Sequence, residues 1–198
     1  MEKVRLETKR LIIREFNESD ILDVYEYSSD EEVCKYLAFG PESLENTEDY
    51  LEKNLAAQFV IPRIRYDLAI CIKSEFLDEN QIEAKAENQD PKLIGGIGLF
   101  LQASKSAELG YILNRKFWNR GYTSEAADVM IKFGFSELGL HRIWASCHIE
   151  NIASVRVLQK IGMQKEGILR SYLPIDGEWH TSLLYAIIED DLDIETWE

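Results

Sequence analysis

The chain has 198 residues, of which 45% are hydrophobic, and this length and composition suit one domain over residues 1–198 with a sizeable core. Its net charge of −14, from 22 Lys and Arg against 36 Asp and Glu, argues against general nucleic-acid binding, which needs a basic surface. The N-terminus shows no signal peptide and no apolar run is long enough to span a bilayer, so we expect a cytoplasmic protein without a membrane partner.

The first predicted element is a strand over residues 6–16, where apolar and polar residues alternate. A short helix is predicted to start at Ser19 or Asp20 and to end near Tyr27, since both residues are good N-caps. Residues 31–37 are predicted to add a helical turn before Gly-Pro breaks the chain.

The next predicted helix starts at Asn46 or Thr47 and ends before Pro62, because apolar residues recur there at helical spacing. A strand is predicted over residues 66–73. The polar stretch over residues 74–91 carries six acidic side chains and is interpreted as a solvated connection or insertion, with a partner-binding acidic arm as the alternative.

A strand is predicted over residues 93–101, where three glycines allow a bulge. A second strand, over residues 107–113, would pair with it. A helix is predicted over residues 126–138. The turn between them should expose unpaired backbone N–H groups at a helix N-terminus, which attracts phosphate. Gly121 would let an anion approach the backbone closely, and Thr123 or Ser124 would cap the helix.

Three cationic residues, Arg115, Lys116 and Arg120, add positive charge to this turn. By itself the turn is a weak phosphate-loop signal, since it has neither of the two common glycine-rich phosphate motifs. An ordinary turn between a strand and a helix fits the same residues equally well.

The C-terminal third is predicted to contain a strand over residues 142–148 and a short helix that starts at Asn151. Two last strands, over residues 163–169 and 182–188, would be joined across Asp176-Gly177. Strands and helices mix without strict alternation, which favours an α/β or α+β fold with a mixed sheet. Three widely spaced cysteines indicate buried reduced thiols, and no His, Cys or carboxylate spacing predicts a metal site.

The order of several motifs resembles the GNAT superfamily of acetyl-CoA-dependent N-acetyltransferases, in particular the branch of the ribosomal-protein N-terminal acetyltransferases. The matching runs are AELGYIL at 107–113, WNRGYTSEA at 118–126, LHRI at 140–143, NIASVRVL at 151–158, KIGM at 160–163 and EG at 166–167. The opening ETKRLIIR at 7–14 and the closing LYA at 184–186 also match the branch, so the resemblance covers almost the whole chain.

The resemblance implies a twisted mixed sheet with splayed central strands, here residues 107–113 and 142–148, and acetyl-CoA in the cleft between them. Its diphosphate would lie on backbone N–H groups of the loop from Asn119 to Ser124. Asn119 departs from a frequent glycine of the family, and Thr123 from a smaller residue. The implied cosubstrate-binding residues are Ile112, Leu113, Asn119, Arg120, Gly121, Tyr122, Thr123, Ser124, Asn151 and Ser154.

The implied chemistry is direct attack of a neutral amine on a thioester, so no covalent enzyme intermediate is needed and Cys147 is expected to be a structural thiol. A backbone N–H of the splayed strand, near Tyr111 to Leu113, would stabilise the oxyanion. Glu108 is the first choice for general base, acting through water, with Tyr111 and His148 as weaker candidates. The position of the family's frequent tyrosine acid holds Leu158, so Ser154 or water would protonate the leaving thiolate.

The branch suggests the N-terminal α-amine of a protein as acceptor, and the negative charge of the chain would suit a basic one. Two alternatives stay open: acetylation of a small amine, such as an amino acid, polyamine or antibiotic, and a catalytically silent acetyl-CoA-binding module. Residues 28–62 and 173–179 would set acceptor specificity. The resemblance also leaves a homodimer open.

Overall fold

The computed structural model describes residues 3–78 and 91–192, and its strands form one eight-stranded sheet in the order β1-β2-β3-β4-β5-β6-β8-β7. Neighbouring strands are antiparallel, except that β5 and β6 are parallel. The strands are β1 (Arg5–Glu7), β2 (Leu11–Glu15), β3 (Arg65–Ile72), β4 (Lys92–Gln102), β5 (Ser106–Leu113), β6 (Arg142–His148), β7 (Gln164–Ile175) and β8 (Glu178–Ile188).

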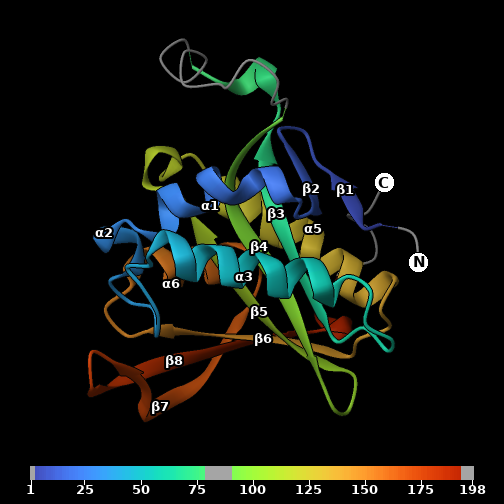
Figure 1. The fold of residues 1–198 in the computed structure, drawn as a ribbon. Helices are drawn as coiled ribbons and strands as arrows, with labels where there is room; N and C mark the ends of the chain where they lie inside the picture. Colours follow the sequence, from blue (N-terminus) through green and yellow to red (C-terminus); the bar gives the residue numbers. More distant parts are fainter. Residues whose placement is uncertain (1–2, 79–90, 193–198) are drawn as a thin grey trace.

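Helices cover both faces of this sheet (Figure 1). The α-helices are α1 (Ile21–Ser28), α2 (Glu31–Cys34), α3 (Leu44–Ala57), α5 (Tyr122–Ser136) and α6 (Ile152–Lys160), and the short 3-10 turns are η1 (Glu18–Asp20), η2 (Ser74–Phe76), η3 (Arg115–Phe117) and η4 (Glu189–Asp191). Helices α1 and α3 lie on one face, with α5 and α6 on the other. Each face has its own apolar core, the larger beneath α5 and the smaller beneath α1 and α3.

The two central strands separate along their length, as the sequence predicts. Strands β5 and β6 pair from Ser106 and Arg142 as far as Glu108 and Trp144. From Leu109 onward, in the described part of the chain, β5 pairs with β4 alone. The predicted mixed sheet with splayed central strands is therefore confirmed.

The prediction of a single strand over residues 6–16 is wrong, because these residues form a β1–β2 hairpin. The backbone N–H and the hydroxyl of Thr8 both bond the carbonyl of Leu11, and the N–H of Leu11 donates to the Thr8 hydroxyl. This local side-chain bonding turns the chain between two apolar runs whose alternation looks continuous in the sequence.

Asp20 is at the N-cap position of α1, as predicted, although its side chain makes no capping bond; the side-chain cap, Asn17, belongs to the preceding turn η1 and accepts from the N–H of Ser19. The cap of α3 lies upstream of the predicted Asn46 or Thr47, because Ser43 accepts from the N–H of Asn46. Most of the acidic connection predicted at 74–91 falls at residues 79–90, outside the described residues, so its role stays a prediction.

Candidate functional site

The open edge of β5 borders a cleft of about 530 Å³. Helix α2 and the residues after it form one wall, α6 forms the other, and the loop from β5 to α5 closes one end. The residues that line it include Tyr36, Tyr111, Ile112, Leu113, Trp118, Asn119, Gly121, Tyr122, Thr123, Ser124, Glu150, Asn151, Ser154 and Lys160. The cleft exists because β6 has diverged from β5 and no strand of the described residues lies between them.

The backbone of β5 alternates between its partner strand and this cleft. The N–H of Asn114 donates to Ile94 of β4 at 2.8 Å, so Ile112, two residues earlier, also faces β4. Tyr111 and Leu113 must then direct their backbone groups toward the open side. The indole N–H of Trp118 bonds the carbonyl of Leu113 at 2.8 Å, which agrees with this direction.

The loop between β5 and α5 ends in a glycine N-cap. Gly121 has φ +78°, a left-handed conformation that favours glycine, and Asn119 also has a positive φ of 60°. The first helical bond runs from the N–H of Glu125 to the carbonyl of Gly121, which leaves the N–H groups of the first turn without helical partners. Neither Thr123 nor Ser124 caps the helix, so that prediction is wrong.

The three cations predicted beside the loop are paired with carboxylates instead. Arg115 lies 3.1 Å from Asp30, and Arg120 lies 2.6 Å from Asp78. Lys116 pairs with Glu26 at 2.5 Å. Each of the three cations therefore already has an ion-pair partner within the protein.

Two cations that the sequence did not single out approach Gly121. A Cβ placed on Gly121 would lie 3.6 Å from Nη2 of Arg10 and 3.7 Å from Nζ of Lys160. Arg10 comes from the β1–β2 hairpin and Lys160 from the last residue of α6. Sequence gives no signal for their approach, because both reach the loop only through the packing of remote segments.

Helix α6 brings two predicted residues to the cleft. The side chain of Asn151 caps α6 by accepting from the N–H of Ser154 at 3.1 Å. The hydroxyl of Ser154 lies 3.1 Å from that of Tyr111, so a pair of hydroxyls bridges β5 and α6. Burial raises the pKa of the Tyr111 phenol far above its ordinary value, which keeps it protonated.

Glu108 lies at the last paired row before the strands separate, opposite Trp144. It is half-buried, and burial raises the pKa of its carboxyl group. It is not among the residues that line the cleft. Leu158, at the position where a tyrosine acid is frequent, packs in the core with 1% of its surface exposed.

His148 at the end of β6 has both ring nitrogens engaged. Nδ1 accepts from the N–H of Glu150 at 3.1 Å, and Nε2 lies 3.1 Å from Nδ1 of His180. Its ring stacks on Tyr36 with centroids 4.8 Å apart. These contacts suit a structural role better than proton transfer, since no ring nitrogen is left for a substrate.

The cysteines Cys34, Cys71 and Cys147 are buried and form no disulfide, as predicted. Burial raises the pKa of the Cys147 thiol to about 11, so it carries little thiolate. Among the described residues, no three His, Cys, Asp or Glu side chains are grouped as a metal ion would require. None of the helices in these same ranges is both long and apolar enough to cross a membrane.

Comparison with known proteins places this geometry in context. Residues 10–164 match the family model described as an acetyltransferase (GNAT) domain. The chain is 35% identical over 189 residues to the uncharacterized N-acetyltransferase YnaD of Bacillus subtilis, which covers 95% of this chain and 99% of the relative. It is 31% identical over 106 residues to the ribosomal protein uS5-alanine N-acetyltransferase of Escherichia coli, covering 52% of this chain and 55% of that one.

A solved structure of an acetyltransferase of the GNAT family from Bacillus anthracis has the same fold. Its TM-score is 0.78 at 32% sequence identity, and the match covers 94% of this chain and 99% of the other. The likeness therefore extends over almost the whole chain.

Proposed function

Because the chain belongs to the GNAT family of acetyltransferases, we propose that it transfers an acetyl group from acetyl-CoA to the N-terminal α-amine of a protein. It is an acetyl-CoA-dependent N-acetyltransferase. The observation that carries the proposal is the cleft along the open edge of β5, which ends at the N-terminus of α5. The end of the cleft at the N-terminus of α5 suits an anion, and the other end lies where β5 and β6 diverge.

The cleft has the chemistry that acetyl-CoA needs. Unpaired N–H groups of the first turn of α5 would hold its diphosphate, with Gly121 leaving room for close approach. The outward carbonyl of Tyr111 and the outward N–H of Leu113 would bond the pantetheine amides as an added strand does. Among the described residues, no acceptor bonds Nδ2 of Asn151. This group would donate a hydrogen bond to the pantetheine arm.

The acetyl group is supplied by the thioester, and two polar groups of β5 would assist its transfer. The N–H of Tyr111 faces the open side and would donate to the acetyl oxygen as negative charge develops there. Glu108, one row below the divergence, would take a proton from the amine through a water molecule, since it does not line the cleft itself.

The hydroxyl pair would deliver the proton to the departing thiolate. Either oxygen of this pair can be the donor; with Tyr111 as donor, the hydroxyl of Ser154 would be oriented to donate in turn. Leu158 is buried, so no side chain at that position competes for this role. Tyr111→Phe should lower kcat while acetyl-CoA affinity stays unchanged in calorimetry, because the phenol lies outside the diphosphate end; equal losses in both would contradict the assignment.

A protein acceptor is supported by the relative that acetylates an alanine of ribosomal protein uS5. The net charge of −14 favours a basic acceptor, since opposite charge raises encounter rates. A small amine is the alternative acceptor, and cosubstrate-binding residues do not discriminate between the two.

The test is release of CoA thiol from acetyl-CoA over matched acceptors. The panel pairs basic N-terminal peptides with the same peptides blocked at the α-amine, and adds polyamines and amino acids. We expect turnover on free N-termini and none on blocked peptides. Turnover on small amines alone would move the assignment to the alternative. Gly121→Glu should abolish binding, because it puts a negative side chain at the diphosphate.

A further inference from the structure

A carboxylate lies in the first turn of α5, where the diphosphate of acetyl-CoA would bind. Glu125 is at the fourth position of the helix, and an unpaired negative charge there would repel an anionic ligand. A carboxylate is unexpected at this position, because Gly121 and the nearby cations Arg10 and Lys160 favour anion binding.

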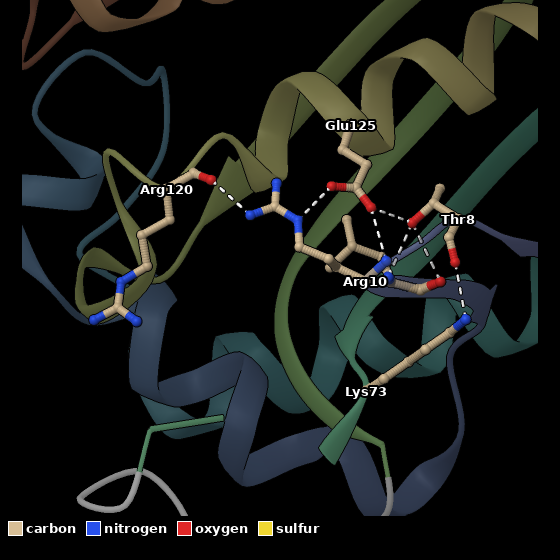
Figure 2. A network of polar contacts seen from close by, with 6 residues as sticks. Thr8, Arg10, Lys73, Arg120 and Glu125 are labelled. Atoms are coloured by element: carbon tan, nitrogen blue, oxygen red, sulfur yellow. Dashed lines mark hydrogen bonds and ion pairs between the residues drawn. The ribbon is translucent and has the colours of Figure 1, made fainter. Parts of the chain in front are cut away.

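Both oxygens of this carboxylate are taken by the β1–β2 hairpin (Figure 2). Oε1 accepts from the hydroxyl of Thr8 at 2.5 Å and from the backbone N–H of Arg10 at 2.9 Å. Oε2 accepts from Nε of Arg10 at 2.7 Å. Burial opposes ionisation of Glu125, but these bonds outweigh it and hold the pKa of the carboxyl group below its ordinary value.

The guanidinium of Arg10 is fixed at three points. Nε bonds Glu125, Nη1 donates to the carbonyl of Arg120 at 2.9 Å, and Cζ lies 4.4 Å above the ring of Tyr122. Figure 2 shows the side chain of Arg120 pointing away from Arg10, so only its carbonyl takes part. Among residues 3–78 and 91–192, the planar fork thus has one nitrogen without a bonded partner, Nη2, on the side of Gly121.

We propose that Glu125 is a positioning residue: it orients Arg10 so that Nη2, together with Nζ of Lys160, grips the diphosphate over Gly121. This inference rests on the proposed function. The two nitrogens stand 3.6 and 3.7 Å from one point above the glycine, although they come from opposite ends of the chain. The loop offers backbone N–H groups from below, and the two cations close the site from above.

A purely structural role for Glu125 predicts the opposite effect on binding. If the carboxylate only fastened the hairpin to α5, Glu125→Gln would remove a negative charge near the ligand and tighten CoA binding. If it positions Arg10, the same substitution loosens the guanidinium and weakens binding. The sign of the change therefore separates the two roles.

The experiment measures Kd by calorimetry for CoA, for dephospho-CoA, which lacks the 3′-phosphate, and for pantetheine, which lacks all phosphates. Arg10→Gln should weaken CoA and dephospho-CoA binding by about 10- to 100-fold, the range of one hydrogen bond to a charged group. Glu125→Gln should weaken both by about tenfold. Pantetheine binding should not change with either variant.

Matched controls remove the same charges nearby. Arg5→Gln changes an exposed arginine in the same hairpin, and Asp128→Asn an exposed carboxylate one turn further along α5. Neither should alter Kd by more than about twofold. Arg10→Lys keeps the positive charge but lacks the planar guanidinium group, and we expect it to bind CoA as weakly as Arg10→Gln does. It serves as a second variant if Arg10→Gln fails to fold.

Four results would overturn the inference. CoA binding that is unchanged or tighter in Glu125→Gln excludes the positioning role. A loss confined to CoA and absent for dephospho-CoA moves Arg10 to the 3′-phosphate. If the unaltered protein does not bind CoA, both the proposed function and this inference are overturned. If the unaltered protein and Arg10→Gln bind CoA equally well, this inference alone is overturned.

Discussion

At the scale of single residues, burial changes the protonation of two carboxyl groups on the sheet face that α3 covers. Asp67 bonds the hydroxyl of Tyr50 at 3.3 Å and lies 3.6 Å from Arg65. Burial outweighs both partners and raises its pKa from 3.8 to about 6. Glu108 is on the same face, two strands away, and burial raises its pKa as well. Both groups therefore titrate closer to neutrality than a solvated carboxyl group does.

The role of Glu108 as general base predicts a change in pH dependence. A base acts when deprotonated, so kcat/KM should rise with pH through the raised pKa of Glu108. Glu108→Gln should remove this acid limb and lower kcat/KM by about 100-fold. Glu137→Gln, an exposed carboxylate beyond α5, is the control. Retention of the acid limb in Glu108→Gln would exclude it as the base.

The raised pKa of Asp67 predicts a change in stability with pH. Its stabilising contribution is present below pH 4, where the carboxyl group is protonated in both states, and is lost as pH rises through about 6. Asp67→Asn should therefore raise the free energy of unfolding at pH 8 by about 2 kcal/mol, and by little at pH 4. Denaturant melts at both pH values test this, with Asp128→Asn as the exposed control; a gain that is equal at both values would contradict it.

At the scale of the element, β4 is fixed between its neighbours by close backbone contact. The register with β3 shifts between Ile70 and Cys71, which leaves Ile94 as the extra residue of a bulge. A Cβ placed on Gly95, the next residue, would stand 2.3 Å from the carbonyl oxygen of Ile112. The glycine thus lets β5 lie against β4 with its other edge free for the cleft.

Gly95→Ala should destabilise the fold by about 2–3 kcal/mol, because the obstructing atom belongs to the backbone of β5 and cannot rotate away. Acetyl-CoA affinity should fall too, since the displaced strand lines the cleft. Gly167→Ala on β7, where a Cβ would meet nothing within 4 Å, should change stability by less than about 0.5 kcal/mol. Similar melting curves for the two variants would show that β5 can shift without cost.

At the scale of the whole molecule, the net charge of −14 would affect how fast a basic acceptor binds more than it affects the fold. Long-range attraction raises the encounter rate of a basic ligand and is screened by salt, with a Debye length of about 10 Å at 0.1 M. The diphosphate end of the cleft is the local exception, because Arg10 and Lys160 lie over it. Under the proposed function, the acidic chain would attract a basic amine, while Arg10 and Lys160 would give the cosubstrate a local basic point.

With saturating acetyl-CoA, kcat/KM for a basic N-terminal peptide should fall about tenfold between 0.05 and 0.5 M salt. A neutral peptide with the same first residue should show little change, since it has no charge for the protein to attract. Equal salt responses of the two peptides would show that net charge does not select the acceptor.

The sequence alone determined the features that depend on neighbouring residues. Asn151 caps α6 as predicted, since the cap and its partner Ser154 are three positions apart. Strands β3, β5 and β6 follow from periodic apolar patterns, and the order of motifs around Gly121 is enough to indicate the family. Local patterns failed where side-chain bonding broke them, as at the Thr8 turn.

Only the tertiary structure decided which charges face the candidate diphosphate site. Arg120 is adjacent to Gly121 in sequence, yet its side chain pairs with Asp78. Arg10 lies far from the loop in sequence and is brought over it by Glu125. The physical reason is that ion pairing depends on distance in space, and the sheet places the ends of the chain beside its middle, which no local pattern records.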